Sequence, residues 1–296
     1  MDDFIETGAD RLTRDVVSRI AAAPDPRIRE TLQALVRHLH AFVREVRPSE
    51  AEWTAAIGFL TRTGQICTDR RQEFILLSDT LGVSMLVDLL NHGRGGAGTE
   101  TTVLGPFYVA SPPEIAQGGD IAAGLPGEPV YIEGVVSSQD GAPLAGAIVD
   151  VWQSDDQGRY DLQFENPDTM FLRGRLVADA QGRFGFWSIM PKSYPIPTDG
   201  PVGALLATAG RHPYRPAHVH FRIAAPGCAE LVTHIFVSGD EYLTSDVVFA
   251  VKQSLIADFE TRTRTIPLAG PAIEKPHRYL RYDFVLQRAQ EAAAAG

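Results

Sequence analysis

Residues 215–223 read RPAHVHFRI, and this run of β-branched and aromatic residues predicts a β-strand. His218 and His220 are two residues apart, so on a strand both imidazoles leave the backbone on the same face. Two neutral imidazoles on one face can bind a single zinc, copper or iron ion, and their spacing does not choose among the three. A buried pair of structural histidines would give the same spacing, so the pair indicates a metal site only together with further donors.

Two tyrosines lie just past the ends of other predicted strands, where loops commonly present functional groups. Tyr160 follows the apolar run AIVDVW of residues 147–152, and Tyr194 follows FGFWSI of residues 184–189. Either tyrosine alone is typical of an ordinary turn or surface position. Two phenols and two imidazoles together would suit ferric iron, because two tyrosinates and one hydroxide neutralise Fe(III) and the bound cation deprotonates the phenols.

From residue 130 onward the chain shows the short runs and turn residues that are typical of an antiparallel β-sandwich. We predict three hairpins, formed by strands at residues 130–136 with 147–152, 172–178 with 183–189, and 218–224 with 231–237. A helix over residues 245–259 and a final strand near residues 281–286 are expected to follow.

Residues 1–92 show helical patterns instead. Between residues 28 and 46, apolar residues recur at helical spacing opposite a face of arginine and glutamate. Asp25 with Pro26 predicts the start of this helix, and Ser49 with Glu52 predicts a capping box for the next one.

Two further helices are predicted over residues 71–81 and 83–90, before a glycine-rich linker at residues 94–98. We therefore predict an α+β fold, in which a helical region at residues 1–98 precedes a β-sandwich domain at residues 99–296. The tail at residues 292–296 is expected to be frayed.

Composition argues against several classes of function. The net charge of −10 argues against a nucleic-acid partner, which would need a basic face. The acidic N-terminus has no signal-peptide pattern, and no apolar run approaches the roughly 18 residues of a membrane span. Cys67 and Cys228 are expected to be buried free thiols, so we expect a cytoplasmic protein without a membrane partner.

Five motifs, in order along nearly the whole chain, resemble those of one enzyme family. They are LGPFY at residues 104–108, AIVDVW followed by GRY at residues 158–160, RGR at residues 173–175, YPIP at residues 194–197 and RPAHVH at residues 215–220. In these motifs the chain resembles the intradiol ring-cleavage dioxygenases. The resemblance implies one non-haem Fe(III) ion per chain, bound by Tyr160, Tyr194, His218 and His220. It also implies a small aromatic diol or triol and O2 as substrates.

The resemblance further implies the role of individual residues in the reaction. Arg215 would lie over the substrate and stabilise negative charge on the attacked ring carbon. Tyr194 would be the axial ligand that the substrate displaces and that then serves as a base. The ring would open between the two hydroxylated carbons without an organic cofactor. The helical N-terminal region would form a homodimer, and a phospholipid bound at the dimer interface is compatible with the resemblance.

One position departs from the family pattern. His234 stands where catechol-cleaving members are expected to carry a glutamine. We interpret His234 as a hydrogen-bond donor beside the metal ligands and not as a further ligand.

Asp79 carries the prediction of the substrate. It lies three residues after Leu76 on a predicted helix, so the two side chains share a face. The pair resembles the pocket of hydroxyquinol-cleaving members, whereas catechol-cleaving members carry an apolar residue at the Asp79 position. A buried carboxylate needs a donor, and the third hydroxyl of benzene-1,2,4-triol (hydroxyquinol) would supply one. An Asp79 that only caps a helix or faces solvent is the alternative.

The resemblance thus implies the opening of hydroxyquinol to the maleylacetate skeleton, with catechol or a chlorocatechol as the alternative substrate. The other expected substrate-binding residues are Val103, Leu104, Gly105, Pro106, Phe107, Ile196, Pro197 and Val248.

Two other classes of protein are weighed against this interpretation. A non-enzymatic, transthyretin-like sandwich would account for residues 134–152 but would leave the two tyrosines and two histidines unexplained. A zinc hydrolase would use His218 and His220, although zinc sites seldom recruit two tyrosines.

Overall fold

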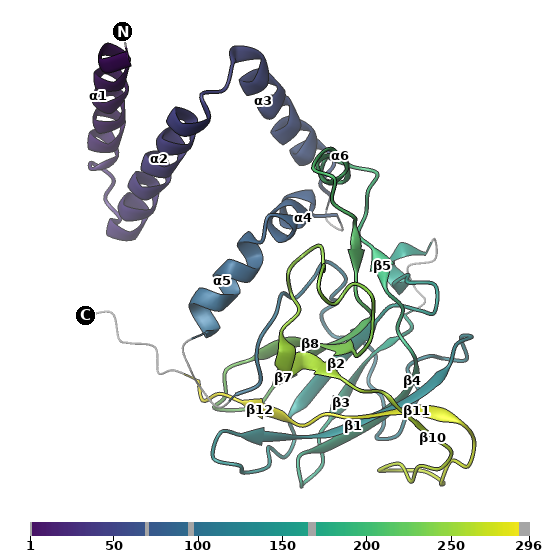
Figure 1. The fold of residues 1–296 in the computed structure, drawn as a ribbon. Helices are drawn as coiled ribbons and strands as arrows, with labels where there is room; N and C mark the ends of the chain where they lie inside the picture. The colour runs from purple at the N-terminus through teal and green to yellow at the C-terminus, as the bar shows by residue number, and fades with distance from the viewer. Residues whose placement is uncertain (1, 69–70, 94–97, 165–169, 290–296) are drawn as a thin grey trace. The chain divides into compact units, whose positions relative to one another are not determined.

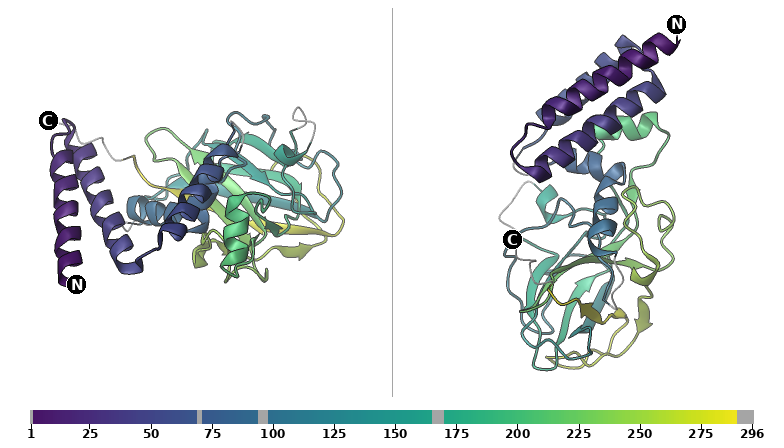
Figure 2. Two further views of the ribbon diagram at one scale, coloured as in Figure 1. Left: turned by 90° about the horizontal axis from the view of Figure 1, so that it is seen from above. Right: turned by 90° about the vertical axis from the view of Figure 1, so that its left-hand side faces the viewer.

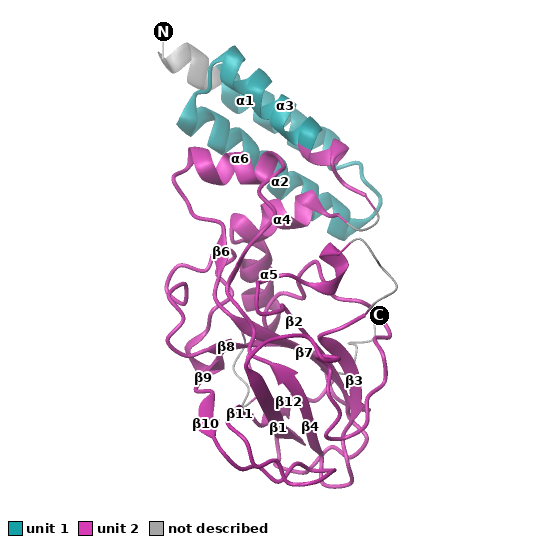
Figure 3. Cartoon of the chain, turned by 90° about the vertical axis from the view of Figure 1, so that its right-hand side faces the viewer, with its two compact units in different colours: residues 1–62 teal, residues 63–296 magenta. Residues whose placement is uncertain are grey.

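The computed structural model describes residues 2–68, 71–93, 98–164 and 170–289. The predicted linker at residues 94–98, apart from its last residue, and the predicted frayed tail lie outside these ranges. The chain forms two compact units, residues 1–62 and residues 63–296 (Figure 3).

The N-terminal unit is helical, as its sequence predicts. Its helices are α1 (Asp2–Ile20), α2 (Pro26–Val46) and most of α3 (Glu50–Gln65). Helices α1 and α2 run side by side (Figure 2), and Arg44 donates to Asp10 across them over 2.7 Å. The Asp25 carboxylate accepts the first backbone N–H groups of α2, which confirms the predicted cap. Ser49 N donates to the Glu52 carboxylate over 2.7 Å, and Glu52 N donates back to Ser49 Oγ over 3.3 Å, which confirms the capping box.

In the described residues, the second unit combines the end of α3 and three further α-helices with two five-stranded sheets (Figure 1). The helices are α4 (Glu73–Thr80), α5 (Val83–His92) and α6 (Pro201–Thr208), and the 3₁₀ turns are η1 (Asp161–Gln163) and η2 (Gln253–Leu255). The first sheet contains β1 (Pro129–Ser138), β4 (Arg183–Ile189), β10 (Glu260–Arg262), β11 (His277–Arg281) and β12 (Phe284–Leu286). The second contains β2 (Ile148–Gln153), β3 (Arg173–Val177), β7 (His218–Ala224), β8 (Leu231–Val237) and β9 (Ile256–Ala257). The short strands β5 (Tyr194–Pro195) and β6 (Tyr214–Arg215) pair separately.

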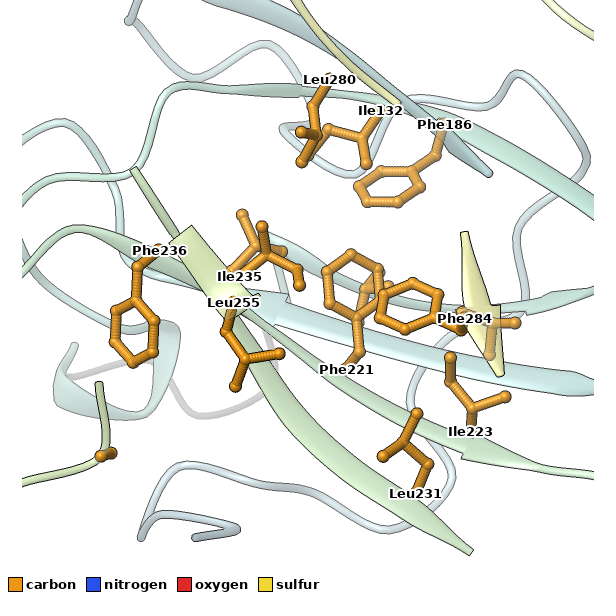
Figure 4. Close-up of a cluster of buried hydrophobic side chains, with 14 of the residues drawn as sticks. Ile132, Phe186, Phe221, Ile223, Leu231, Ile235, Phe236, Leu255, Leu280 and Phe284 are labelled. Carbon is orange, nitrogen blue, oxygen red and sulfur yellow. The ribbon is translucent and has the colours of Figure 1, made fainter. Parts of the chain in front are cut away.

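The hydrophobic core lies between the inner faces of the two sheets (Figure 4). Ile132, Phe186 and Leu280 come from the first sheet, and Phe221 and Ile235 from the second. Burying each such side chain contributes about 1.5–3 kcal/mol, so this layer fixes β7 firmly in place. Because side chains alternate along a strand, the core position of Phe221 puts the even-numbered residues of β7 on the opposite face.

The sandwich is mixed and not purely antiparallel. Strands β11 and β12 run parallel to β1, and β9 runs parallel to β8. Of the three predicted hairpins, β7–β8 is confirmed. The other two are wrong, because β1 pairs with β4 while β2 pairs with β3 and β7. The turns after β1 and β3 carry the chain from one sheet to the other, and turn residues alone do not specify strand partners.

The predicted helix over residues 245–259 is also wrong. The Asp246 carboxylate accepts the backbone N–H groups of Val248 and Ala250, at 3.3 and 3.0 Å, and these bonds replace helical ones. Phe249 between them has a φ of 60°, which is outside the right-handed helical region. The segment instead forms a loop, then η2 and β9, while α6 is a helix that was not predicted.

Cys67 and Cys228 are free, as predicted, but they are half-buried and not fully buried. Within the described ranges, no helix has both the length and the apolar character that a bilayer span requires.

Candidate active site

Three histidines converge on the face of the second sheet that is turned away from the core. His218 and His220 lie two residues apart on β7 and so share one face. His234 lies opposite His220 on β8. All three are at most 1% exposed, and their donor nitrogens lie within 4.8 Å of one another. The Nε2 atoms of His218 and His220 are only 3.1 Å apart. Nitrogens this close, and this deeply buried, can share one metal ion.

Neighbouring groups fix the direction of the His218 and His220 rings. Nδ1 of His218 donates to the carbonyl oxygen of Pro216 over 2.7 Å. The proton is therefore on Nδ1, and the lone pair of Nε2 can bind a metal ion. The ring of His220 stacks on Trp152 of β2, with centroids 4.6 Å and planes 16° apart. Within the described chain, Nδ1 of His220 and Nε2 of His234 have no hydrogen-bond partner.

Tyr160 reaches the histidines from the loop that follows β2. Its Oη lies 3.1 Å from Nε2 of His220 and 3.5 Å from Nε2 of His218. The preceding turn depends on Gly158, which has a φ of 79° and where a Cβ would lie 2.8 Å from Cβ of Tyr194. The two tyrosine loops can therefore approach each other only because position 158 has no side chain.

Tyr194 enters the site from β5. The pairing of β5 with β6 places Tyr194 opposite Arg215. The Tyr194 ring meets that of Tyr160 edge-on at a centroid distance of 5.2 Å and lies 5.7 Å from the ring of His218. Both tyrosines are at most 3% exposed. The structure therefore brings all four predicted metal-binding residues together.

Burial sets the protonation of this group. It lowers the pKa values of His218, His220 and His234 well below 6.5, and the surrounding imidazoles and Arg215 add to that effect. Burial, and then the neighbouring Tyr194, raises the pKa of the Tyr160 phenol well above 10. The imidazoles are therefore neutral, as metal ligands must be, and the phenol ionises only beside a strong positive charge.

These donors fit a metal ion. Neutral imidazole nitrogens and buried phenols converge: Nε2 of His218 and Nε2 of His220 lie 3.1 Å apart, and Oη of Tyr160 lies 3.1 Å from Nε2 of His220. Imidazole suits several transition metals, but paired phenol oxygens favour a hard, highly charged ion.

Arg215 supplies a fixed positive charge beside the donors. It is 3% exposed, and its Nη1 lies 3.2 Å from Nε2 of His218 while its Nη2 lies 3.4 Å from Nδ1 of His234. Burial lowers the pKa of Arg215, but the charges of Asp246 and the tyrosines outweigh that effect and raise it overall. The guanidinium is therefore always charged, and it can stabilise negative charge that develops next to the donor group.

Asp79 on α4 lies near enough to Arg215 for the two charges to interact. It is only 4% exposed, so it does not face solvent. Burial raises the pKa of Asp79, while Ser84 and then Arg215 act in the opposite direction. Leu76, one turn earlier, belongs to the same buried cluster as Ile196 and Val248.

Two of the other expected substrate-binding residues pack directly against the proposed metal-binding side chains. The ring of Phe107 stacks on Tyr160 at a centroid distance of 4.2 Å and an angle of 14°. A Cβ at Gly105 would lie 3.2 Å from Cε1 of His220, so this stretch of backbone lies against the histidine.

The remaining predicted substrate-binding residues differ in exposure. The backbone of Val103 is close enough to His234 to affect its pKa. Leu104 is 39% exposed, Pro106 is exposed and Pro197 is half-buried.

Three residues have roles at the site that the sequence did not reveal. Asp246 pairs with Arg215 from 31 positions further along the chain. Arg173 forms a buried ion pair with Asp161 and donates to the carbonyl oxygen of Phe107 over 3.0 Å, so it ties the Tyr160 loop to the pocket wall. The RGR motif pointed to Arg173 but not to its role, and only the pairing of β2 with β7 reveals that Trp152 supports His220.

Comparison with known proteins places the chain in a family. A family model described as Dioxygenase matches residues 103–288, and one described as Catechol dioxygenase N terminus matches residues 25–98. The chain therefore belongs to the intradiol ring-cleavage dioxygenases, non-haem iron enzymes that act on aromatic substrates and O2.

Individual relatives are similar over most of their length. Hydroxyquinol 1,2-dioxygenase of Nocardioides simplex is 49% identical over 278 residues, which are 92% of this chain and 94% of the relative. The 6-chlorohydroxyquinol 1,2-dioxygenase of Cupriavidus pinatubonensis is 52% identical over 252 residues, 85% of this chain and 91% of the relative. The crystal structure of hydroxyquinol 1,2-dioxygenase from Pseudomonas putida DLL-E4 superimposes with a TM-score of 0.89 at 46% identity, covering 96% of this chain and 100% of that one.

Proposed function

We propose that the protein is a hydroxyquinol 1,2-dioxygenase. It opens benzene-1,2,4-triol with O2 between the adjacent hydroxylated carbons and forms 3-hydroxy-cis,cis-muconate, the enol form of maleylacetate. The observation that carries this choice of substrate is the carboxylate of Asp79, which is 4% exposed and interacts with Arg215. Ser84 donates one hydrogen bond to this carboxylate. A buried carboxylate can accept more than one, and the third hydroxyl of hydroxyquinol supplies a further donor. The similarity to two dioxygenases that act on hydroxyquinols supports the same choice.

The proposed cofactor is one non-haem Fe(III) ion per chain, held by Tyr160, Tyr194, His218 and His220. Bound ferric iron supplies the Lewis acidity and charge transfer that make a deprotonated diol reactive toward O2. The support for this set of ligands is the convergence of two buried phenols with neutral imidazoles, because two tyrosinates offset most of the trivalent charge.

The surrounding side chains bind and orient the substrate. Oη of Tyr194 accepts a proton from one substrate hydroxyl, and the Arg215 guanidinium stabilises negative charge on the attacked ring carbon. Asp79 accepts a hydrogen bond from the third hydroxyl, and Phe107 with Gly105 closes the wall beside the donors. The rest of the proposed substrate pocket consists of Leu76, Val103, Leu104, Pro106, Ile196, Pro197 and Val248.

Oxygen uptake by purified protein tests the proposal, with hydroxyquinol, catechol and a chlorocatechol as substrates and with metal analysis of the same sample. We expect about one iron per chain, a reddish tyrosinate-to-iron absorption and the highest kcat/KM for hydroxyquinol. A preference for catechol or a chlorocatechol would refute the substrate and leave the iron site standing. Colourless protein containing zinc would favour a hydrolase, and colourless protein without any metal would favour a binding module.

The helices at residues 1–98 are proposed to form a homodimer, and residues 99–296 to form the catalytic domain. Within the described chain, α2 buries none of its residues. Its apolar side chains are 40–58% exposed, namely Ile28, Leu32, Leu35, Leu39, Phe42, Val43 and Val46. An apolar stripe of this length is typical of a surface that another molecule covers. Light scattering tests the dimer, and mass spectrometry of an organic extract tests whether a phospholipid is bound at the interface.

A cytoplasmic location is proposed as well. Free thiols are typical of a reducing compartment, and both cysteines of the chain are free. Cell fractionation with detection of the protein tests this location.

A further inference from the structure

The buried partner of Arg215 is Asp246, from the loop that follows β8. Nε of Arg215 donates to Oδ1 of Asp246 over 3.1 Å, and Nη2 donates to Oδ2 over 3.3 Å. The two side chains are only 4% and 2% exposed. A two-point contact of this kind fixes the plane of a guanidinium as well as its position.

The contact also decides which edge of the guanidinium faces the four proposed metal-binding side chains. Asp246 occupies Nε and one side of Nη2, so Nη1 is left to point at Nε2 of His218, 3.2 Å away. An arginine side chain has several rotatable bonds, and in the absence of the carboxylate those bonds would be free to turn. Asp79, the other carboxylate near Arg215, forms no hydrogen bond with it in the described chain.

The same carboxylate shapes one wall of the pocket. Its oxygens accept the backbone N–H groups of Val248 and Ala250 at 3.3 and 3.0 Å. One side chain therefore holds both the guanidinium and the loop that carries Val248, so the two stay at a fixed separation.

We infer that Asp246 is a positioning residue for ring cleavage, which holds Nε and Nη2 of Arg215 so that Nη1 faces the reacting ring. This inference rests on the proposed function. It differs from a role in loop structure alone, because a loop role would act on Val248 and substrate binding, whereas a positioning role acts through Arg215 on the rate. A misplaced catalytic group typically costs about 10²-fold in rate.

A double-mutant cycle separates the two roles. The enzymes to compare are Asp246→Asn, Arg215→Lys and the double variant, each loaded with iron. Asparagine keeps one oxygen for the loop amides but cannot accept two bonds from a charged guanidinium. We expect kcat of Asp246→Asn to fall about 10²-fold, with substrate binding unchanged when it is measured without O2 from the change in visible absorption. The double variant should be no slower than Arg215→Lys alone.

A matched control is Asp179→Asn. Its carboxylate also accepts two backbone N–H groups, from Gln181 and Arg183, and the guanidinium of Arg183. It lies in an exposed turn between β3 and β4. This variant should keep wild-type kcat and KM, which shows that loss of such a contact does not slow the enzyme in general.

Rate losses that multiply in the double variant would overturn the inference, as would a raised KM at unchanged kcat in Asp246→Asn. If Asp246→Asn does not fold, Asp246→Glu keeps the charge but displaces it by one methylene group, and wild-type kcat in that folded variant would also overturn the inference. The proposed substrate can fail separately. Wild-type enzyme that prefers catechol would refute it, while the same cycle measured with catechol would still decide the role of Asp246.

Discussion

Replacement of Asp79 tests the substrate most directly. Asp79→Leu removes the carboxylate and gives the position an apolar side chain, as expected for catechol-cleaving members. A hydrogen bond to a charged group in a buried site contributes about 1.5–3 kcal/mol. Since about 1.4 kcal/mol corresponds to a factor of ten, the ratio of kcat/KM for hydroxyquinol to that for catechol should fall about 10- to 150-fold. Most of the fall should come from lost activity on hydroxyquinol, because catechol has no third hydroxyl and makes no such hydrogen bond.

The stability of Asp79→Asn provides a second test of the same carboxyl. Its pKa is raised above 3.8 because burial disfavours the charged form, despite Ser84 and Arg215. A carboxyl with a raised pKa contributes stability below the unfolded value and loses that contribution as the pH rises through the folded value. Asp79→Asn should therefore be more stable than wild type at pH values above the folded pKa. This difference should shrink as the pH falls toward 3.8.

Asp88→Asn is the control with the opposite sign. Burial opposes the change, but Thr101 and Lys252 outweigh it and lower the pKa of Asp88. This variant should be less stable than wild type above the ordinary aspartate pKa, and the loss should disappear as the pH falls through the folded value. Steady-state kinetics on both substrates and denaturant melts across pH are the assays. An unchanged substrate ratio in Asp79→Leu would refute the hydrogen bond to the third hydroxyl, whatever the stability shows.

The remaining predictions concern the metal and its neighbours. His218→Ala should lose iron and visible colour together, and full iron content with an unchanged spectrum would contradict its role as a ligand. Tyr194→Phe should lose activity to a greater extent than iron, because phenylalanine cannot accept the substrate proton while Tyr160, His218 and His220 would still hold the ion; equal losses would indicate an ordinary ligand. Arg215→Lys should bind iron and substrate but turn over about 10²–10³-fold more slowly, and wild-type rates would rule out its role at the ring. His234→Gln should retain iron, as shown by metal analysis, and a loss as large as that of His218→Ala would make it a ligand.

Local sequence signals predicted the parts of the fold that depend on local bonds. The start of α2 depends on one carboxylate, Asp25, and on N–H groups two and three residues away. Strand β7 was predictable because alternating residues either enter the core, as Phe221 does, or turn away from it, as His220 does. The two wrong hairpins involve choices of partner between strands, such as β1 with β4, and no residue at a turn carries that information.

The helix predicted over residues 245–259 failed for a reason that also bears on the site. The Asp246 side chain accepts the backbone N–H groups two and four residues ahead. Such bonds compete with a helix, and Arg215 holds the same carboxylate in place. The loop structure is therefore linked to a long-range ion pair, which the sequence of the loop alone could not predict.

Charge explains why three clustered histidines need not all be ligands. Their nitrogens lie within 4.8 Å of one another, so distance alone would permit a site of three neutral imidazoles. Such a site would leave the full charge of a trivalent ion uncompensated beside the buried guanidinium of Arg215, which lies 3.2 Å from His218. Two positive charges close together in a buried site repel each other at a high cost in free energy. Two tyrosinates remove most of that repulsion. We therefore expect His234, whose Nδ1 lies 3.4 Å from Arg215, to act on the substrate side of the site while Tyr160 and Tyr194 complete the metal site.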